Sequence, residues 1–133
     1  MDLLTPALRQ RLLANGASPG DHVPVVKFFN PLGAATWLIS ELDSDGDTLF
    51  GLADLGFGCP ELGSMSLAEI AAVRLPLGLR LERDLHFAPC HPLSVYAAAA
   101  RAQGQITENL KHLADAAAVL AREAAAGRSR SPP

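Results

Sequence analysis

The sequence predicts an α+β fold: a small antiparallel sheet of about four strands, helices on one face, and an alanine-rich helix at the C-terminal end. Three observations support this class. Hydrophobic residues make up 49% of the 133 residues and charged residues 19%, which suits one buried core. All seven aromatic residues lie between residues 28 and 96, where short β-branched stretches alternate with turn signals. Thirteen of the 23 alanines follow residue 96, where helical spacing prevails.

A short helix is expected near the beginning of the chain. Thr5 can accept a hydrogen bond as its N-cap, and Pro6 fits its first position because proline lacks the N–H that would be unpaired there. Asn15-Gly16 offers a left-handed stop. The expected helix therefore spans about three turns.

Three strands follow, each rich in β-branched or aromatic residues, over residues 23–29, 36–42 and 48–55. The Asp- and Gly-rich residues 43–47 predict a hairpin turn between the last two. Strict alternation along the middle strand would place Trp37, Ile39 and Glu41 on one face, with Leu42 on the other.

The second half of the chain predicts mostly helix. The glycine-rich residues 56–63 indicate an irregular connection, and the capping box of Ser66 and Glu69 opens a helix that ends near Arg74. A half-exposed strand is expected over residues 79–84, and helices over 93–102 and 106–125. The predicted organisation is one α+β domain over residues 1–103, a helical extension over 104–126 and a disordered tail over 127–133.

The composition excludes several classes of protein. The chain has no apolar run of membrane-spanning length and no secretory signal, so a cytoplasmic location is expected, with no membrane partner. Two cysteines, Cys59 and Cys90, cannot form a disulfide framework, and with His86 and His91 they supply only half of a zinc pattern. An isoelectric point near 5.7 argues against direct binding to nucleic acid, which needs a basic surface.

The charges are segregated along the chain. Residues 28–73 contain seven acidic residues and no Lys or Arg, so the net charge of −3 is −7 there and +4 elsewhere. Asp43, Asp45 and Asp47 should gather at the hairpin, and Glu61 lies in the glycine-rich connection. Such a surface can bind a basic patch of another protein, can imitate the charge of DNA, or can simply keep the protein in solution.

The hairpin also resembles a calcium loop in part. Asp43, Asp45, Asp47 and Asp54 occupy positions 1, 3, 5 and 12 of that pattern, but Thr48 stands where the pattern requires glycine. The flanking residues also predict strands, whereas the calcium loop lies between helices. No metal or cofactor is therefore assigned, and weak surface binding of a divalent cation stays open.

A second cluster follows in the expected strand over residues 79–84. Alternation would place Glu82, Asp84 and His86 on one face and Arg83 on the other. Two carboxylates and an imidazole can hold a divalent metal or share a proton. The alternative is a charged strand end whose carboxylates pair with Lys27 or another base.

The last helix carries a narrow stripe with four–three spacing: Ile106, Leu110, Leu113, Ala117, Leu120 and Ala124. Such a stripe can dock on its own domain, pair with a second copy as a homodimer, or bind a partner helix.

Several motifs occur in order at suitable spacing: residues 24–29, 36–38, 41–43, 49–52, 60–63, 66–69 and 81–87. On these motifs residues 1–103 resemble an uncharacterised bacterial family, domain of unknown function 2958. The resemblance implies a small cytoplasmic protein that is often encoded on plasmids and conjugative elements. It implies no activity and no catalytic residues.

From these patterns we expect a non-catalytic protein-interaction module of a mobile genetic element. Its acidic surface would modulate a nucleic-acid-handling or defence enzyme of the host. No nucleophile or cofactor motif is present, so no catalytic residue is assigned. The alternative is a metal-dependent hydrolase or nucleotide-acting enzyme built on Glu82, Asp84, His86 and the hairpin aspartates.

Overall fold

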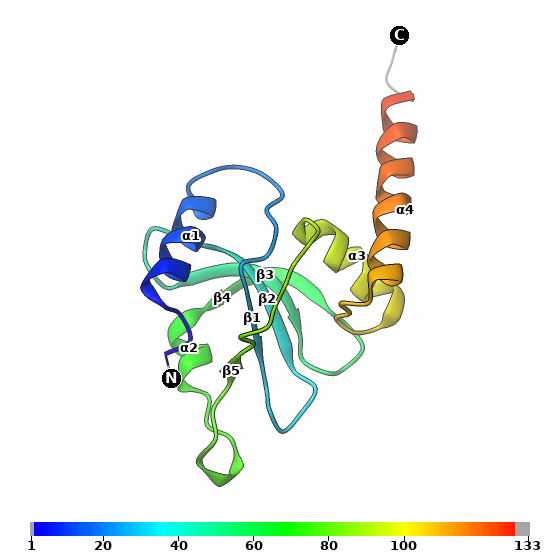
Figure 1. Ribbon diagram of the computed structural model, residues 1–133. Coiled ribbons are helices and arrows are strands. Elements are labelled where there is room, and N and C mark those ends of the chain that lie inside the picture. Colours follow the sequence, from blue (N-terminus) through cyan, green and yellow to red (C-terminus); the bar gives the residue numbers. More distant parts are fainter. Residues whose placement is uncertain (1, 130–133) are drawn as a thin grey trace.

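A computed structural model describes residues 2–129 and confirms the α+β class (Figure 1). The elements in chain order are α1 (Pro6–Gly16), β1 (Val26–Phe29), β2 (Thr36–Leu42), β3 (Thr48–Asp54), β4 (Glu61–Ser66), α2 (Leu67–Ala72), a 3₁₀ turn η1 (Pro76–Gly78), β5 (Glu82–Arg83), α3 (Leu93–Gln103) and α4 (Leu110–Ser129). The sheet is antiparallel throughout, with strand order β4-β3-β2-β1-β5. It has five strands where the sequence indicated about four.

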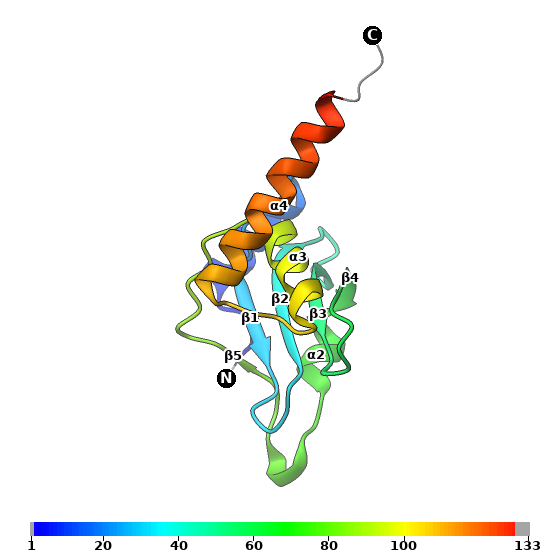
Figure 2. The same cartoon turned by 90° about the vertical axis from the view of Figure 1, so that its right-hand side faces the viewer.

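Helices cover both faces of the sheet, whereas the sequence predicted one. On the first face Leu12 of α1 and Ile70 of α2 pack with Phe28 of β1 in one core cluster. On the second face Leu38 and Leu52 of the sheet pack with residues of α3 and α4. Figure 2 shows α3 and α4 in front of the sheet. The short α2 and the long α4 therefore belong to different layers.

A β-bulge in β2 changes which side chains share a face. The pairing register with β3 shifts between Ile39 and Glu41, so Glu41 pairs with Phe50. Because the bulge adds one residue, Ile39 and Leu42 enter the same core cluster. The predicted alternation is therefore wrong after Ile39, and Glu41 lies on the opposite face from that residue.

Helix α1 follows the predicted caps at its start but not at its end. Thr5 Oγ1 accepts the Leu8 N–H at 3.2 Å, as predicted for an N-cap. Gly16 has no left-handed conformation. Its missing side chain instead permits close packing, because a Cβ there would lie 2.2 Å from the Leu42 carbonyl oxygen. Asn15 Nδ2 donates to the Ser40 carbonyl at 2.9 Å, which fixes the same end of α1 to the bulge.

The later elements differ in their bounds from the prediction. Part of the glycine-rich connection is strand β4, and the strand expected over residues 79–84 shortens to the two residues of β5. Helix α4 includes residues 127–129, which were assigned to a disordered tail, and the remaining tail residues 130–133 lie outside the described part. The division into a domain and an extension at residue 103 stays a prediction.

The N-terminal half of α4 packs against the domain, and its C-terminal half projects beyond it (Figures 1 and 2). Leu113 and Ala116 are buried in the second core cluster, whereas residues 121–127 are all exposed. No helix within residues 2–129 has the length and apolar character needed to cross a membrane.

Candidate interaction surface

The aspartates of the β2–β3 hairpin serve largely to build the turn. Asp45 accepts the Thr48 hydroxyl at 2.6 Å and the backbone N–H groups of Asp47 and Thr48 at 2.8 Å each. The side-chain hydrogen bond from Thr48, followed by the backbone N–H donors, lowers the pKa of Asp45 below its usual value. The Asp45 carboxylate is therefore exposed, but its oxygens are used in hydrogen bonds within the turn.

Asp47 connects the hairpin to the beginning of α2. Its Oδ2 accepts the Ser66 hydroxyl at 2.8 Å, and its Oδ1 accepts the Ala68 N–H at 2.8 Å. Ser66 Oγ in turn accepts the Glu69 N–H at 3.2 Å, as the capping box predicts. No local pattern indicates the contact between Asp47 and Ser66, because nineteen residues separate them in the chain.

An open groove of about 290 Å³ lies beside the hairpin. Gly16, Glu41, Asp43, Thr48, Phe50 and Ser64 line it. The bulge brings Glu41 into this groove by pairing it with Phe50. Within residues 2–129, the Glu41 carboxylate has no hydrogen-bond or ion-pair partner, and the Asp43 carboxylate accepts only the N–H of the adjacent Ser44. The groove therefore combines two available carboxylates with one aromatic ring.

The remaining acidic candidates of the hairpin region lie apart from this groove. Glu61 is the first residue of β4, is exposed and pairs with Ala53. Asp54 is at the far end of β3 from the hairpin, roughly 20 Å along the strand. The partial calcium pattern is therefore not assembled in space.

The cluster predicted around β5 is dispersed. Asp84 lies after the strand, where its Oδ1 accepts the His86 N–H at 2.8 Å in a turn. Its Oδ2 is 3.5 Å from Lys27 Nζ, and the same ammonium is 2.6 Å from Glu108. The Asp84 N–H still donates to the Lys27 carbonyl at 2.9 Å, but the chain then turns, so the alternation that would align Glu82 and Asp84 with His86 does not extend to His86.

Arg83 has a structural contact as well. Its guanidinium donates to the carbonyl oxygens of Asp2 at 3.2 Å and Leu3 at 2.7 Å, which holds the beginning of the chain against β5. Over the described residues, no three His, Cys, Asp or Glu side chains are grouped so that they could hold a metal ion. The two cysteines are exposed and unpaired.

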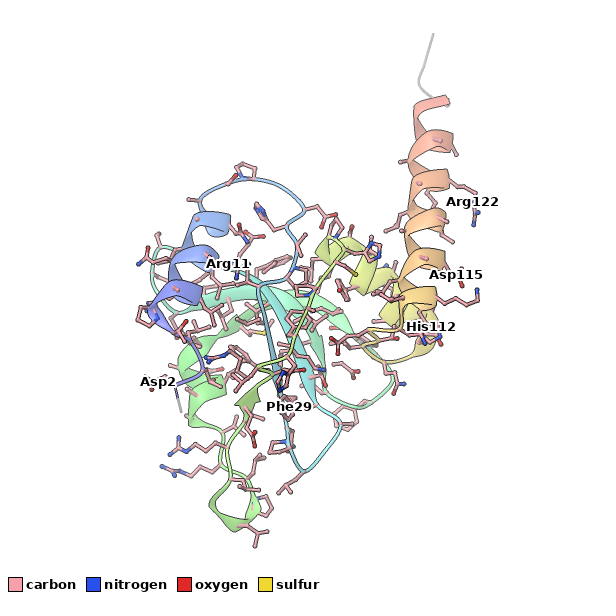
Figure 3. All side chains as sticks on the ribbon, viewed as in Figure 1. Asp2, Arg11, Phe29, His112, Asp115 and Arg122 are labelled. Atoms are coloured by element: carbon pink, nitrogen blue, oxygen red, sulfur yellow. The ribbon has the colours of Figure 1, made fainter. Side chains whose placement is uncertain are left out.

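The predicted stripe of α4 is only partly a packing surface. Leu113 is 1% exposed, and Ala117 and Leu120 pack partly on the second core cluster. Leu110 is 70% exposed, and Ile106 precedes the helix instead of belonging to it. The stripe therefore docks on its own domain at its centre and leaves Ala124 exposed. Figure 3 shows Asp115 and Arg122 pointing into solvent from the same helix.

Asp54 has a role that sequence reasoning missed. It is 3% exposed, and its two oxygens accept the N–H groups of Gly56 and Ile106, each at 2.9 Å. The carboxylate thus ties the segment leading into α4 to the end of the sheet. The available signal was an aspartate at the end of an apolar strand, two residues before a glycine.

These features define a small α+β protein with a five-stranded antiparallel sheet, an acidic groove and, within the described residues, no grouped metal ligands. The chain belongs to the family described as "Protein of unknown function (DUF2958)", which matches residues 3–107. No curated protein and no solved structure shows significant similarity to it. The family match confirms the resemblance found in the sequence and extends four residues past the predicted boundary of 103.

Proposed function

We propose that this protein is a non-catalytic interaction module that binds a basic segment of another protein at the acidic groove. The observation that carries the proposal is the pair Glu41 and Asp43 beside Phe50. Within residues 2–129, the Glu41 carboxylate has no partner and that of Asp43 accepts one N–H, whereas the carboxylates of Asp45 and Asp47 each accept two or more hydrogen bonds. A lysine or arginine head can pair with them while its apolar stem covers the ring.

The distribution of charge supports a protein partner of this kind. The hairpin, β4 and every groove-lining residue except Gly16 fall in the stretch of residues 28–73 that has seven acids and no Lys or Arg. One cation from outside this stretch lies at the hairpin, because the Arg9 guanidinium donates to the Gly46 carbonyl at 3.1 Å. A predominance of negative charge over one region speeds association with a partner of opposite sign and disfavours other partners. Enzymes that handle nucleic acid carry basic surfaces, so we propose such a host enzyme as the partner of a protein encoded on mobile DNA.

Affinity capture from a bacterial lysate tests this function. The immobilised protein is compared with the double variant Glu41→Gln/Asp43→Asn and with the control Asp115→Asn/Glu123→Gln, which removes the same charge from the exposed part of α4. We expect proteins retained at low salt by the parent and the control to be lost with the groove variant and at high salt. Equal retention by the groove variant would overturn the proposal.

A further inference from the structure

Strand β4 forms an open edge of the sheet. It pairs with β3 on one side only, at the end of the strand order, and Figure 2 shows it at the margin of the sheet. Its residues Glu61, Leu62 and Ser64 are exposed. Its register with β3 is continuous over all six residues, without a bulge. An exposed edge of this kind is a template for pairing with another strand.

The hydrogen-bond pattern shows which backbone groups of β4 face outward. The Leu67 N–H donates to the Asp47 carbonyl at 2.9 Å, so these two residues form a bonded pair next to the ladder. Bonded and non-bonded pairs alternate in an antiparallel ladder. The pairs Phe50–Ser64 and Leu52–Leu62 are therefore non-bonded, and the N–H and C=O groups of Leu62 and Ser64 point away from β3.

This edge lacks the usual protection of natural sheets. Lysine, proline and bulges commonly prevent edge strands from pairing with other chains. The sequence of β4 contains neither Lys nor Pro. Among residues 2–129, no other element donates to or accepts from the backbone of Leu62 or Ser64. The N–H and C=O groups of Leu62 and Ser64 are therefore available to pair with an added strand.

The charge around the edge indicates what can occupy it. Glu61 begins the strand, and Asp47 bonds to Ser66 at its end. The small Ser64 side chain also lines the acidic groove. A second copy of this chain would bring like charges together along the same edge, which is unfavourable, whereas a strand with basic side chains would neutralise them.

We infer that β4 binds an extended basic peptide segment of the partner as an added strand. The segment would exchange hydrogen bonds with the backbone of Leu62 and Ser64, and its lysines or arginines would lie on the face of the sheet that carries Ser64 and the acidic groove. The inference rests on the proposed function for the charge of the partner. It adds the conformation of the bound segment and the element that receives it.

The test uses a synthetic octapeptide in which lysine and valine alternate, added to the full-length protein at millimolar concentration. Amide hydrogen exchange by NMR should show new protection at Leu62 and Ser64, while Gly63 and Met65, which bond to β3, are protected with and without peptide. A peptide with N-methyl groups on all its backbone amides should bind about tenfold more weakly, because it has lost the donors that would pair with the carbonyl oxygens of Leu62 and Ser64.

A variant provides a second measurement. Ser64→Pro removes the outward N–H without removing a bond to β3, and should weaken the peptide about tenfold at an unchanged melting temperature, whereas Ser64→Ala should bind normally. Should the proline variant fail to fold, the amide protection in the parent protein decides alone.

Three outcomes would overturn strand addition. Peptide binding without protection of Leu62 and Ser64 would reject it and leave the proposed function standing. Protection of these amides that grows with protein concentration in the absence of peptide would assign the edge to a second copy. No binding of the peptide would also reject strand addition, while the lysate capture decides the function separately.

Discussion

Removing the buried carboxylate of Asp54 should destabilise the protein by about 2–3 kcal/mol. The perturbation is Asp54→Ala, which deletes two hydrogen bonds of 2.9 Å, from Gly56 and Ile106. Gly56 is exposed, so water can replace the carboxylate there at a cost of roughly 0.5–1 kcal/mol. The Ile106 N–H is in a half-buried position, and leaving it unpaired costs about 1–3 kcal/mol.

Urea unfolding followed by Trp37 fluorescence measures this loss, since the single tryptophan lies in the sheet. Asp54→Asn offers one oxygen in place of two, so it recovers one of the bonds and should fall between the parent and Asp54→Ala. The matched control is Asp115→Ala, whose exposed ion pair with Lys111 should contribute less than about 0.5 kcal/mol. A loss below about 1 kcal/mol for Asp54→Ala, or a stability of Asp54→Asn equal to that of the parent, would refute the reasoning.

Three further predictions concern the core and α4. Tyr96→Phe removes the hydroxyl that accepts the Cys90 N–H at 3.1 Å, and should cost about 1 kcal/mol in urea unfolding at pH 7. Burial also raises the pKa of Tyr96 above its usual value of 10.0. Because this tyrosine then ionises at a lower pH in the unfolded chain than in the folded protein, the stability of the parent should fall as the pH rises above 10.0. The stability of Tyr96→Phe should fall less over the same range of pH. Gly51→Ala would place a Cβ 2.1 Å from the Leu38 carbonyl oxygen, so we expect the free energy of unfolding, measured by circular dichroism, to fall by more than about 3 kcal/mol. A fall of less than about 1 kcal/mol would contradict the close approach of β2 and β3. A chain that ends after Leu120 keeps Leu113 and Ala116, which are the buried residues of α4 among residues 110–127. It should melt within a few degrees of the parent, whereas a large decrease would show that the removed residues stabilise the domain.

The elements that the sequence predicted well are those with local causes. The caps at Thr5 and Ser66 involve residues three positions away, so each signal is complete within one turn of helix. The turn over residues 43–47 has the same local character, since Asp45 accepts from Asp47 and Thr48. Such signals can be interpreted without knowing the rest of the fold.

The elements that the sequence predicted poorly depend on distant residues. Strand β4 contains Gly63, and glycine weakens a strand by itself, so only pairing with β3 accounts for it. The expected strand over residues 79–84 pairs with β1 at Phe28 and Phe29 only, so two residues of it remain. Strand length here is set by the neighbouring strand, which local propensity does not reveal.

The candidate site shows the same division between local and distant causes. Sequence reasoning treated Asp43, Asp45 and Asp47 as one surface, and it did not assign Glu41. The bulge, which is a property of two paired strands, places Glu41 in the groove with Asp43. Replacing the three aspartates together would therefore disturb the turn and the cap of α2 along with the surface. Replacing Glu41 and Asp43 instead removes charge from the groove and leaves the hydrogen bonds of Asp45 and Asp47 in place.

The acidic charge near β4 has two consequences that follow from the same residues. An edge strand without Lys or Pro invites pairing between identical chains, which leads to aggregation. Glu61 on the strand and Asp47 at its end oppose that pairing, because two copies would bring these carboxylates together. The same charges favour a strand of opposite sign. In the strand addition proposed above, negative charge takes the place of the lysines that commonly protect an edge, because it opposes a second copy and favours a basic strand.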